Sequence, residues 1–264
     1  MTAGGTARIA EAFDRVQREG RRAALMPYLM GGFPSVDASR AIGAACAENG
    51  ADLLEFGIPY SDPLADGPVI HAAATAALSN GVRLDDVLGV CRALSDSIPV
   101  VLMVYANPIL ARGQSEFARM AADAGAAGII VPDLPHDEAG ELRSACDAAG
   151  IALVPLVAPT STDERIAEVG RDARGFVYTV STTGTTGERS SLPPEIGRTV
   201  ERVRASTSLP VAVGFGISTP EQAAEVGEIA DGVIVGSRVV RAAGEGGAAA
   251  VGAVVGELAD ALRH

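Results

Sequence analysis

Residues 53–68 have the sequence Leu53-Leu54-Glu55-Phe56-Gly57-Ile58-Pro59-Tyr60-Ser61-Asp62-Pro63-Leu64-Ala65-Asp66-Gly67-Pro68 and show most clearly the strand-and-loop pattern of this chain. A short apolar run typical of a buried strand is followed by a proline-rich loop. Burial predicts a raised pKa for Glu55, whereas Asp66 in a polar loop is expected to stay ionised. Two carboxyl groups in such unlike surroundings suit acid–base chemistry near neutral pH. The alternative is a structural strand-end Glu followed by an ordinary Asp-Gly turn.

Apolar strands followed by helices recur along the rest of the chain. Besides the start of residues 53–68, the predicted strands are 24–30, 99–105, 127–131, 151–156, 175–180, 209–214 and 232–235. The predicted helices are 8–20, 35–49 with Ser35 as N-cap, 71–78, 84–94, 117–124, 138–149, 163–170, 194–204, 220–226, 238–243 and 249–262. This order predicts an α/β fold, with residues 1–264 forming a single (β/α)8 TIM-barrel domain. The helix before the first strand and the short helix after strand 8 are extra to the barrel. A doubly wound open sheet is the alternative, but no G-x-G-x-x-G follows the first strand to support it.

Composition restricts the protein class. With 48% hydrophobic and 20% charged residues, the chain resembles ordinary globular proteins. The net charge of −12 argues against non-specific binding to nucleic acid. No apolar run approaches the roughly 20 residues of a membrane span, and the charged N-terminus is unlike a signal peptide. Cys46, Cys91 and Cys146 are expected to be reduced core residues, so a cytoplasmic protein is predicted.

The absence of lysine restricts the chemistry further. All 21 basic residues are arginine, so no Schiff base can form on a lysine side chain. The only histidines are His71, His136 and His264, which makes a histidine-rich metal site improbable. We therefore expect chemistry that uses carboxylates, hydroxyls, backbone groups and arginine, with no metal and no cofactor in this chain.

Polar and glycine-rich segments follow the predicted strands, where a barrel of this kind carries its active site. They are residues 55–66, 105–108, 132–135, 181–187, 214–218 and 236–237. Glycines and a serine after the last two strands, Gly216, Gly236 and Ser237, favour a phosphate site; tight turns and a helix N-cap are the alternative. Residues 181–187 are expected to form a mobile loop over the substrate, or else a plain surface loop. Apolar lining is expected from Tyr28, Met103, Ile130, Phe215 and Ile234, each of which could instead be core.

These motifs resemble the tryptophan synthase alpha subunit family over essentially the whole chain. The resemblance depends on residues 55–68, with support from Tyr105-Ala106-Asn107-Pro108, Pro132-Asp133-Leu134-Pro135, Thr185-Thr186-Gly187, Gly214-Phe215-Gly216-Ile217-Ser218 and Gly236-Ser237. It implies retro-aldol cleavage of indole-3-glycerol phosphate to indole and glyceraldehyde 3-phosphate. Glu55 would be the acid–base group, and Asp66 would stabilise positive charge at the indole N–H. The implied substrate-binding residues are Tyr28, Ile70, Met103, Tyr105, Ile130, Tyr178, Thr186, Gly187, Phe215, Gly216, Ile234, Gly236 and Ser237.

The resemblance also implies a partner, a beta subunit that carries pyridoxal phosphate, in an alpha2beta2 assembly. The implied docking residues are Asp62, Asn107, Pro108, Asp133 and Pro135. The family often has Arg soon after the serine of loop six, where this chain has Thr182, so the resemblance does not extend to the loop-closure contacts and their coupling to the partner. Two other functions remain open: a stand-alone lyase of the same fold, and a catalytically silent barrel that binds and activates a partner.

Overall fold

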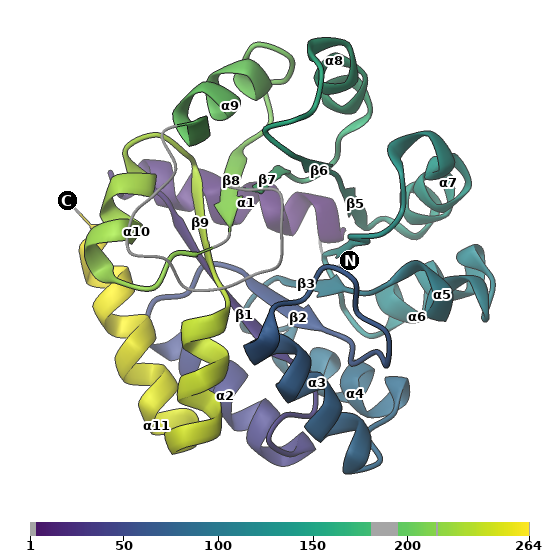
Figure 1. Cartoon of the computed structure of the whole chain (residues 1–264), viewed down its shortest axis with the longest axis vertical. Helices are drawn as coiled ribbons and strands as arrows, with labels where there is room; N and C mark the ends of the chain where they lie inside the picture. Colours follow the sequence, from purple (N-terminus) through teal and green to yellow (C-terminus); the bar gives the residue numbers. More distant parts are fainter. Residues whose placement is uncertain (1–3, 181–194, 215, 264) are drawn as a thin grey trace.

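The computed structural model describes residues 4–180, 195–214 and 216–263 of the chain. Its strands are β1 (Ala24–Met30), β2 (Leu54–Gly57), β3 (Val100–Met103), β4 (Gly128–Ile130), β5 (Ala152–Val154), β6 (Leu156–Val157), β7 (Val177–Val180), β8 (Val211–Gly214) and β9 (Gly232–Val235). They pair in parallel in the order β5-β4-β3-β2-β1-β9-β8-β7-β6. Figure 1 shows the strands surrounded by helices, as expected when each parallel strand is followed by a crossover helix.

The ring of strands closes at Pro155. β5 pairs with β4, β6 pairs with β7, and Pro155 separates the two short strands. Proline has no N–H to donate, but its carbonyl accepts a hydrogen bond from the backbone N–H of Tyr178 at 3.0 Å. β5 and β6 therefore occupy one position of the ring, and the (β/α)8 TIM barrel that the sequence predicts is confirmed.

The helices are α1 (Gly5–Arg18), α2 (Val36–Glu48), α3 (Pro68–Ser79), α4 (Leu84–Leu94), α5 (Ala106–Leu110), α6 (Gln114–Asp123), the 3-10 turn η1 (His136–Glu138), α7 (Gly140–Ala149), α8 (Asp163–Asp172), α9 (Glu195–Arg204), α10 (Pro220–Gly227) and α11 (Ser237–Ala261). α2 begins as predicted, because the Ser35 hydroxyl accepts a hydrogen bond from the Ala38 N–H at 3.2 Å. α1 lies across one end of the strands (Figure 1), where Phe13 contacts the ring of Phe176 at a centroid distance of 5.9 Å.

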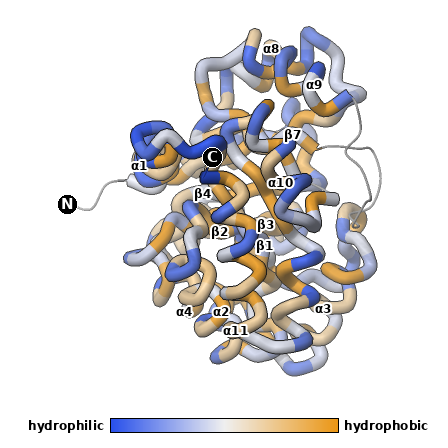
Figure 2. The backbone as a smooth tube through the Cα atoms, turned by 90° about the vertical axis from the view of Figure 1, so that its left-hand side faces the viewer, coloured by the Kyte–Doolittle hydropathy of each residue, from blue (hydrophilic) through white to orange (hydrophobic). Residues whose placement is uncertain are grey.

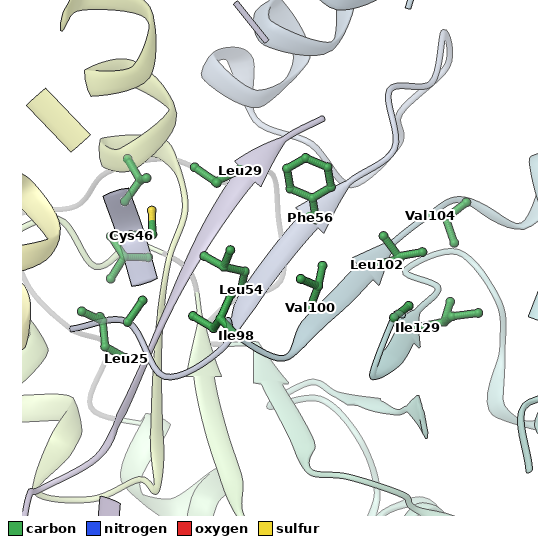
Figure 3. Packing of buried hydrophobic residues seen from close by; sticks show 14 of the residues in the cluster. Leu25, Leu29, Cys46, Leu54, Phe56, Ile98, Val100, Leu102, Val104 and Ile129 are labelled. Carbon is green, nitrogen blue, oxygen red and sulfur yellow. The ribbon is translucent and has the colours of Figure 1, made fainter. Parts of the chain in front are cut away.

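Alternation along the strands creates two apolar layers. Leu54 and Phe56 on β2 face outward and pack with Leu25, Val100 and Leu102 beneath the helices (Figure 3). The strand residues that alternate with these outward-facing ones point inward. Together with α1 they form the barrel interior. Figure 2 accordingly shows the central strands as mainly hydrophobic, with hydrophilic segments on the outer helices. This alternation places Glu55, between Leu54 and Phe56, inside the barrel.

Two connections differ from the sequence-based expectation. The sequence predicts no separate helix at α5 or η1, because both are too short to show helical periodicity. The short helix expected after the last strand and the C-terminal helix are both present within α11, which is interrupted at Gly247. Gly247 has φ +58° and ψ −143°, a conformation that is open to glycine and costly for other residues.

α11 also bears on the expectation about membrane spans. Among the described residues it is the one helix long and apolar enough to cross a membrane by length and composition alone. It is interrupted at Gly247, and residues from both of its segments, including Val239 and Val255, belong to the core beneath the helices. These contacts are those of a helix in the outer layer of the barrel.

Candidate functional site

Glu55 lies at the centre of the candidate site. It pairs in register with Tyr28 on β1 and with Val101 on β3, and only 1% of its surface is exposed. Neither carboxyl oxygen has a hydrogen-bond partner among the described residues. Burial disfavours the charged form and raises the pKa of Glu55 to about 8, in the direction that the sequence predicts. Glu55 is thus a carboxyl group that holds its proton at neutral pH.

Two phenol groups share the barrel interior with Glu55. Tyr28 on β1 and Tyr178 on β7 are buried, and the carboxyl group of Glu55 helps to raise the pKa of both. Burial is the larger cause in each case. Glycines make room for their hydroxyl groups: a Cβ atom on Gly57 would lie 2.0 Å from the Tyr28 hydroxyl, and one on Gly214 would lie 2.2 Å from the Tyr178 hydroxyl. The strand glycines are therefore required for these two rings to fit.

Asp66 reaches the same site from the loop after β2. The Tyr105 hydroxyl donates a hydrogen bond to Asp66 Oδ1 at 3.0 Å and accepts one from the Ala65 N–H at 3.1 Å. Burial raises the pKa of Asp66, while the Tyr105 hydrogen bond and the charge of His71 lower it. The loop is thus less exposed than its polar sequence suggests. The hydrogen bond from Tyr105 offsets part of the effect of burial on the pKa of Asp66. Both Asp66 and Glu55 act on the pKa of Tyr28, so the two acids lie at one end of the barrel.

Apolar side chains predicted to line the site come together around these acids. Ile130 on β4 and Ile234 on β9 pack in the interior cluster with Tyr178, and Met103 borders it. Ile70 on α3 packs against Tyr28 in a neighbouring cluster. Met103 borders both clusters, so residues from six separate segments adjoin, although the same contacts also make them part of the barrel core.

The segments predicted to bind phosphate are described only in part. Gly216 has φ +79°, a left-handed conformation that favours glycine. Gly236 precedes Ser237, the first residue of α11, and a Cβ atom on Gly236 would come no closer than 3.7 Å to another residue. Predicted residues Thr186, Gly187 and Phe215 lie outside the described residues, as does Thr182.

The predicted docking residues lie on adjacent loops after β2, β3 and β4. Asp62, Asn107, Asp133 and Pro135 are exposed and Pro108 is partly so. Asp133 Oδ1 accepts a hydrogen bond from the Ala106 N–H at 2.8 Å, which ties the loop after β4 to the start of α5. The same surface includes Leu64 and Leu110, which are 82% and 59% exposed.

Sequence reasoning missed two residues near Asp66. The Tyr60 ring stacks on Tyr105 at a centroid distance of 5.2 Å, and its hydroxyl accepts a hydrogen bond from Asn107 Nδ2 at 3.2 Å. His71, in the first turn of α3, acts on Asp66 by its charge. The position of Tyr60 inside the residue 53–68 segment was the available signal, whereas nothing local distinguished His71.

No group of three or more His, Cys, Asp or Glu side chains that could hold a metal ion occurs within residues 4–180, 195–214 and 216–263. The chemically distinctive groups of the site are instead a buried carboxyl group, a hydrogen-bonded carboxyl group and two buried phenols. Fold and site together define a TIM-barrel enzyme with acidic side chains at the mouth of the barrel.

Comparison with known proteins identifies the family. The family model for the tryptophan synthase alpha chain matches residues 13–259. The tryptophan synthase alpha chain of Synechococcus elongatus is 46% identical over 257 residues, covering 96% of each chain. That of Methanosarcina mazei is 45% identical over 240 residues, covering 90% of this chain and 88% of its own.

Solved structures agree with this result. A chain of Mycobacterium tuberculosis tryptophan synthase superimposes with a TM-score of 0.92 at 44% identity, covering 100% of both chains. Tryptophan synthase subunit alpha from Legionella pneumophila str. Paris gives a TM-score of 0.87 at 36% identity, covering 97% of this chain and 98% of its own. The chain belongs to the tryptophan synthase alpha chain family, and it is a lyase with the alpha-subunit role in tryptophan biosynthesis.

Proposed function

We propose that this chain cleaves indole-3-glycerol phosphate to indole and glyceraldehyde 3-phosphate by general acid–base catalysis, with Glu55 and Asp66 as the catalytic residues. The observation that carries the proposal is the burial of the Glu55 carboxyl group without a hydrogen-bond partner among the described residues. Its carboxyl group is buried in the barrel and has a pKa of about 8, so it has a proton to donate at neutral pH.

Glu55 serves in both proton transfers. It first protonates the indole ring carbon that bears the glycerol chain, which leaves positive charge on the ring nitrogen. The Glu55 carboxylate formed by this step then takes the proton of the adjacent glycerol hydroxyl. The carbon–carbon bond breaks, its electrons return to the ring, and the hydroxyl carbon becomes the aldehyde. The Glu55 carboxyl group is restored to its protonated form at the end.

Asp66 has the complementary role of stabilising positive charge at the indole N–H. Tyr105 donates a hydrogen bond to Asp66 Oδ1, which favours the carboxylate form and holds one oxygen in place. Within the described residues, the other carboxylate oxygen of Asp66 accepts no hydrogen bond. No donor there competes with the indole N–H for this oxygen. No lysine is available, so the cleavage proceeds without a Schiff base, and we also propose that it needs no metal.

Glu55→Gln tests the mechanism, because it removes the proton donor and very little binding surface. We expect cleavage to be abolished while affinity for a non-cleavable indole alkyl phosphate stays within about threefold. Asp66→Asn is expected to lower the rate of cleavage less than Glu55→Gln does. Near-wild-type cleavage by Glu55→Gln would refute the mechanism, and indole release by the wild-type chain excludes a catalytically silent barrel.

Phosphate binding is proposed at Gly216, Gly236 and Ser237, with Thr186, Gly187 and Phe215 completing the substrate site. The N-terminus of α11 begins at Ser237, and N–H groups at a helix start attract anions. Tyr28, Ile70, Met103, Tyr105, Ile130, Tyr178 and Ile234 are proposed to surround the rest of the substrate. Gly236→Val would add a branched side chain at the first helical turn and raise KM; an unchanged KM would remove this segment from the site.

The proposed partner is a tryptophan synthase beta subunit that carries pyridoxal phosphate, in an alpha2beta2 assembly in the cytoplasm. The exposed side chains of Leu64 and Leu110 support docking at the loops after β2 and β3, beside Asp62, Asn107, Pro108, Asp133 and Pro135. The three cysteines are buried free thiols, which agrees with a reducing compartment.

Leu110→Asp should weaken complex formation with a beta chain in sedimentation experiments. Leu78→Asp is the matched control, because Leu78 is also exposed but lies at the far end of α3. Equal effects of the two substitutions would argue against docking at this surface. Indole release that is unchanged when a beta chain is added would instead favour a stand-alone lyase.

A further inference from the structure

Two segments of the loop after β2 meet on one aromatic ring. Tyr105 precedes α5 and is 4% exposed. On one side its ring stacks with Tyr60, with an interplanar angle of 28°. Its hydroxyl donates to Asp66 and accepts from the Ala65 N–H. Tyr105 therefore touches the beginning and the end of the same loop, and any change at Tyr60 bears on the ring that holds Asp66.

Tyr60 is itself held from outside the loop. Asn107 Nδ2 donates a hydrogen bond to the Tyr60 hydroxyl at 3.2 Å. Asn107 lies in α5, which begins directly after Tyr105, so both contacts of Tyr60 come from one short segment. The Ala106 N–H is in turn bound to Asp133. Hydrogen bonds thus link the segments after β2, β3 and β4 next to Tyr105.

We propose that Tyr60 is a positioning residue for the cleavage reaction: by stacking on Tyr105 and bonding to Asn107, it keeps the Tyr105 hydroxyl on Asp66. A phenol ring has two side-chain torsions, and stacking removes much of their freedom. Without the Tyr60 ring, Tyr105 has space to turn, and the Asp66 carboxylate loses the hydrogen bond that fixes its direction. The inference rests on the proposed role of Asp66 in stabilising charge at the indole N–H.

The test measures indole release from indole-3-glycerol phosphate by the isolated full-length chain, so contacts with a partner do not enter. Tyr60→Leu removes the stacking and the hydroxyl, and is expected to lower kcat about tenfold with KM changed less than about twofold. Tyr60→Phe and Asn107→Ala each remove only the hydrogen bond, and should lower kcat by about twofold to threefold. Their double variant should equal either single variant, because both remove the same bond.

Asn80→Ala is the matched control for Asn107→Ala. The Asn80 amide also makes an exposed hydrogen bond, to the Pro34 carbonyl at 3.3 Å, but lies at the end of α3 outside this network. It should leave kcat unchanged. Urea unfolding of every variant separates loss of fold from loss of positioning, and Tyr60→Phe keeps the test available if Tyr60→Leu does not fold.

The pH profile provides a readout that a merely structural role would not move. Asp66 interacts electrostatically with Tyr105, with His71 on α3 and with Tyr28 on β1. Glu55 also acts on the pKa of Tyr28. The Tyr105 hydrogen bond lowers the pKa of Asp66, so losing it raises that pKa. The acid side of the kcat profile should therefore move to higher pH in Tyr60→Leu, and Tyr60→Leu should have little further effect on kcat in a Tyr105→Phe background.

Asp66→Asn is measured beside these variants to separate two kinds of failure. If Asp66→Asn loses activity while Tyr60→Leu keeps the wild-type kcat and pH profile, the positioning role of Tyr60 is wrong and the proposed function stands. If Asp66→Asn keeps the wild-type kcat, the proposed role of Asp66 and the inference both fail. The inference would also be overturned if Tyr60→Leu lowered kcat in the Tyr105→Phe background by the same factor as in the wild type.

Discussion

The Tyr28 hydroxyl lies directly against Gly57, where a Cβ atom would be 2.0 Å away. Gly57 is the last residue of β2, two positions after Glu55 on the same face of the strand. Because Gly57 has no side chain, the Tyr28 ring can lie against β2. Tyr28 is also the residue of β1 that pairs in register with Glu55.

Gly57→Ala should therefore be destabilising. The new methyl group would force the Tyr28 ring or the strand to move, and such overpacking costs about 1–3 kcal/mol. Gly236→Ala is the control, since its Cβ atom would come no closer than 3.7 Å to another residue. Urea unfolding should show a clearly lower free energy of unfolding for Gly57→Ala than for Gly236→Ala, and equal values would contradict the predicted clash.

Glu55 should make stability depend on pH. Its pKa is about 8 in the folded chain and 4.5 as the ordinary value, so between these pH values the folded chain holds a proton that the unfolded chain has released. The Glu55 contribution to the free energy of unfolding therefore falls as the pH rises from 4.5 to 8. The Glu55→Gln variant lacks this pH-dependent loss. Its free energy of unfolding, relative to that of the wild type, should therefore rise with pH by up to about 1.4 kcal/mol per pH unit in that window.

Urea unfolding at several pH values within the window measures this difference, and the exposed Glu141→Gln controls for the chemical change itself. Parallel pH dependences for wild type and Glu55→Gln would show that Glu55 is not held in its neutral form by burial.

Thr179→Val should stabilise the protein. Thr179 on β7 is fully buried, and its hydroxyl has no hydrogen-bond partner within the described residues. Replacing this hydroxyl with a methyl group of similar size removes an unsatisfied polar group and should raise the free energy of unfolding by about 1 kcal/mol.

Thr199→Val is the matched control for Thr179→Val. Thr199 is 2% exposed, and its hydroxyl donates to the Glu195 carbonyl at 3.0 Å. It should gain nothing from the same substitution. Thermal unfolding of both variants compares them directly, and a less stable Thr179→Val would mean that its hydroxyl is satisfied in the folded protein.

Asp52→Asn should lower stability without affecting cleavage. Asp52 is 2% exposed and accepts hydrogen bonds from Arg15, Arg21 and the Leu25 N–H at distances of 2.6–3.0 Å. Losing its charge leaves the mostly buried Arg21 without its main partner, at a cost of about 2–3 kcal/mol. Because Asp52 precedes β2, at the end of the barrel opposite Asp66, kcat should be unchanged.

The exposed ion pair between Asp123 and Arg119 provides the comparison for Asp52. Their charged atoms are 2.7 Å apart, but Asp123 is 59% exposed in its side chain. Asp123→Asn should lower the free energy of unfolding much less than Asp52→Asn does, since water screens exposed pairs. Similar losses for the two substitutions would show that burial of the Asp52 pairs adds nothing to stability.

The barrel and its order of strands and helices could be predicted from the sequence, which also singled out Glu55 and Asp66 as candidate acids. These features depend on short-range patterns: alternation of apolar residues in strands, helical spacing, an N-cap at Ser35, and a carboxyl group inside an apolar run. The raised pKa of Glu55 could be predicted because burial of its own strand causes it. α5 and the break at Pro155 in the strand predicted over residues 151–156 were missed, since elements this short have too few residues to show a period.

Contacts between residues far apart in the chain could not be predicted from the sequence and follow from the folded arrangement of the strands. Tyr105 donates to Asp66 across 39 positions, and Asn107 donates to Tyr60 across 47. Such contacts require the ends of neighbouring strands to bring their loops together at a fixed register, and no local pattern specifies which side chains then touch. The groups that act on the pKa of Asp66 likewise come from outside its loop, Tyr105 from the segment before α5 and His71 from α3.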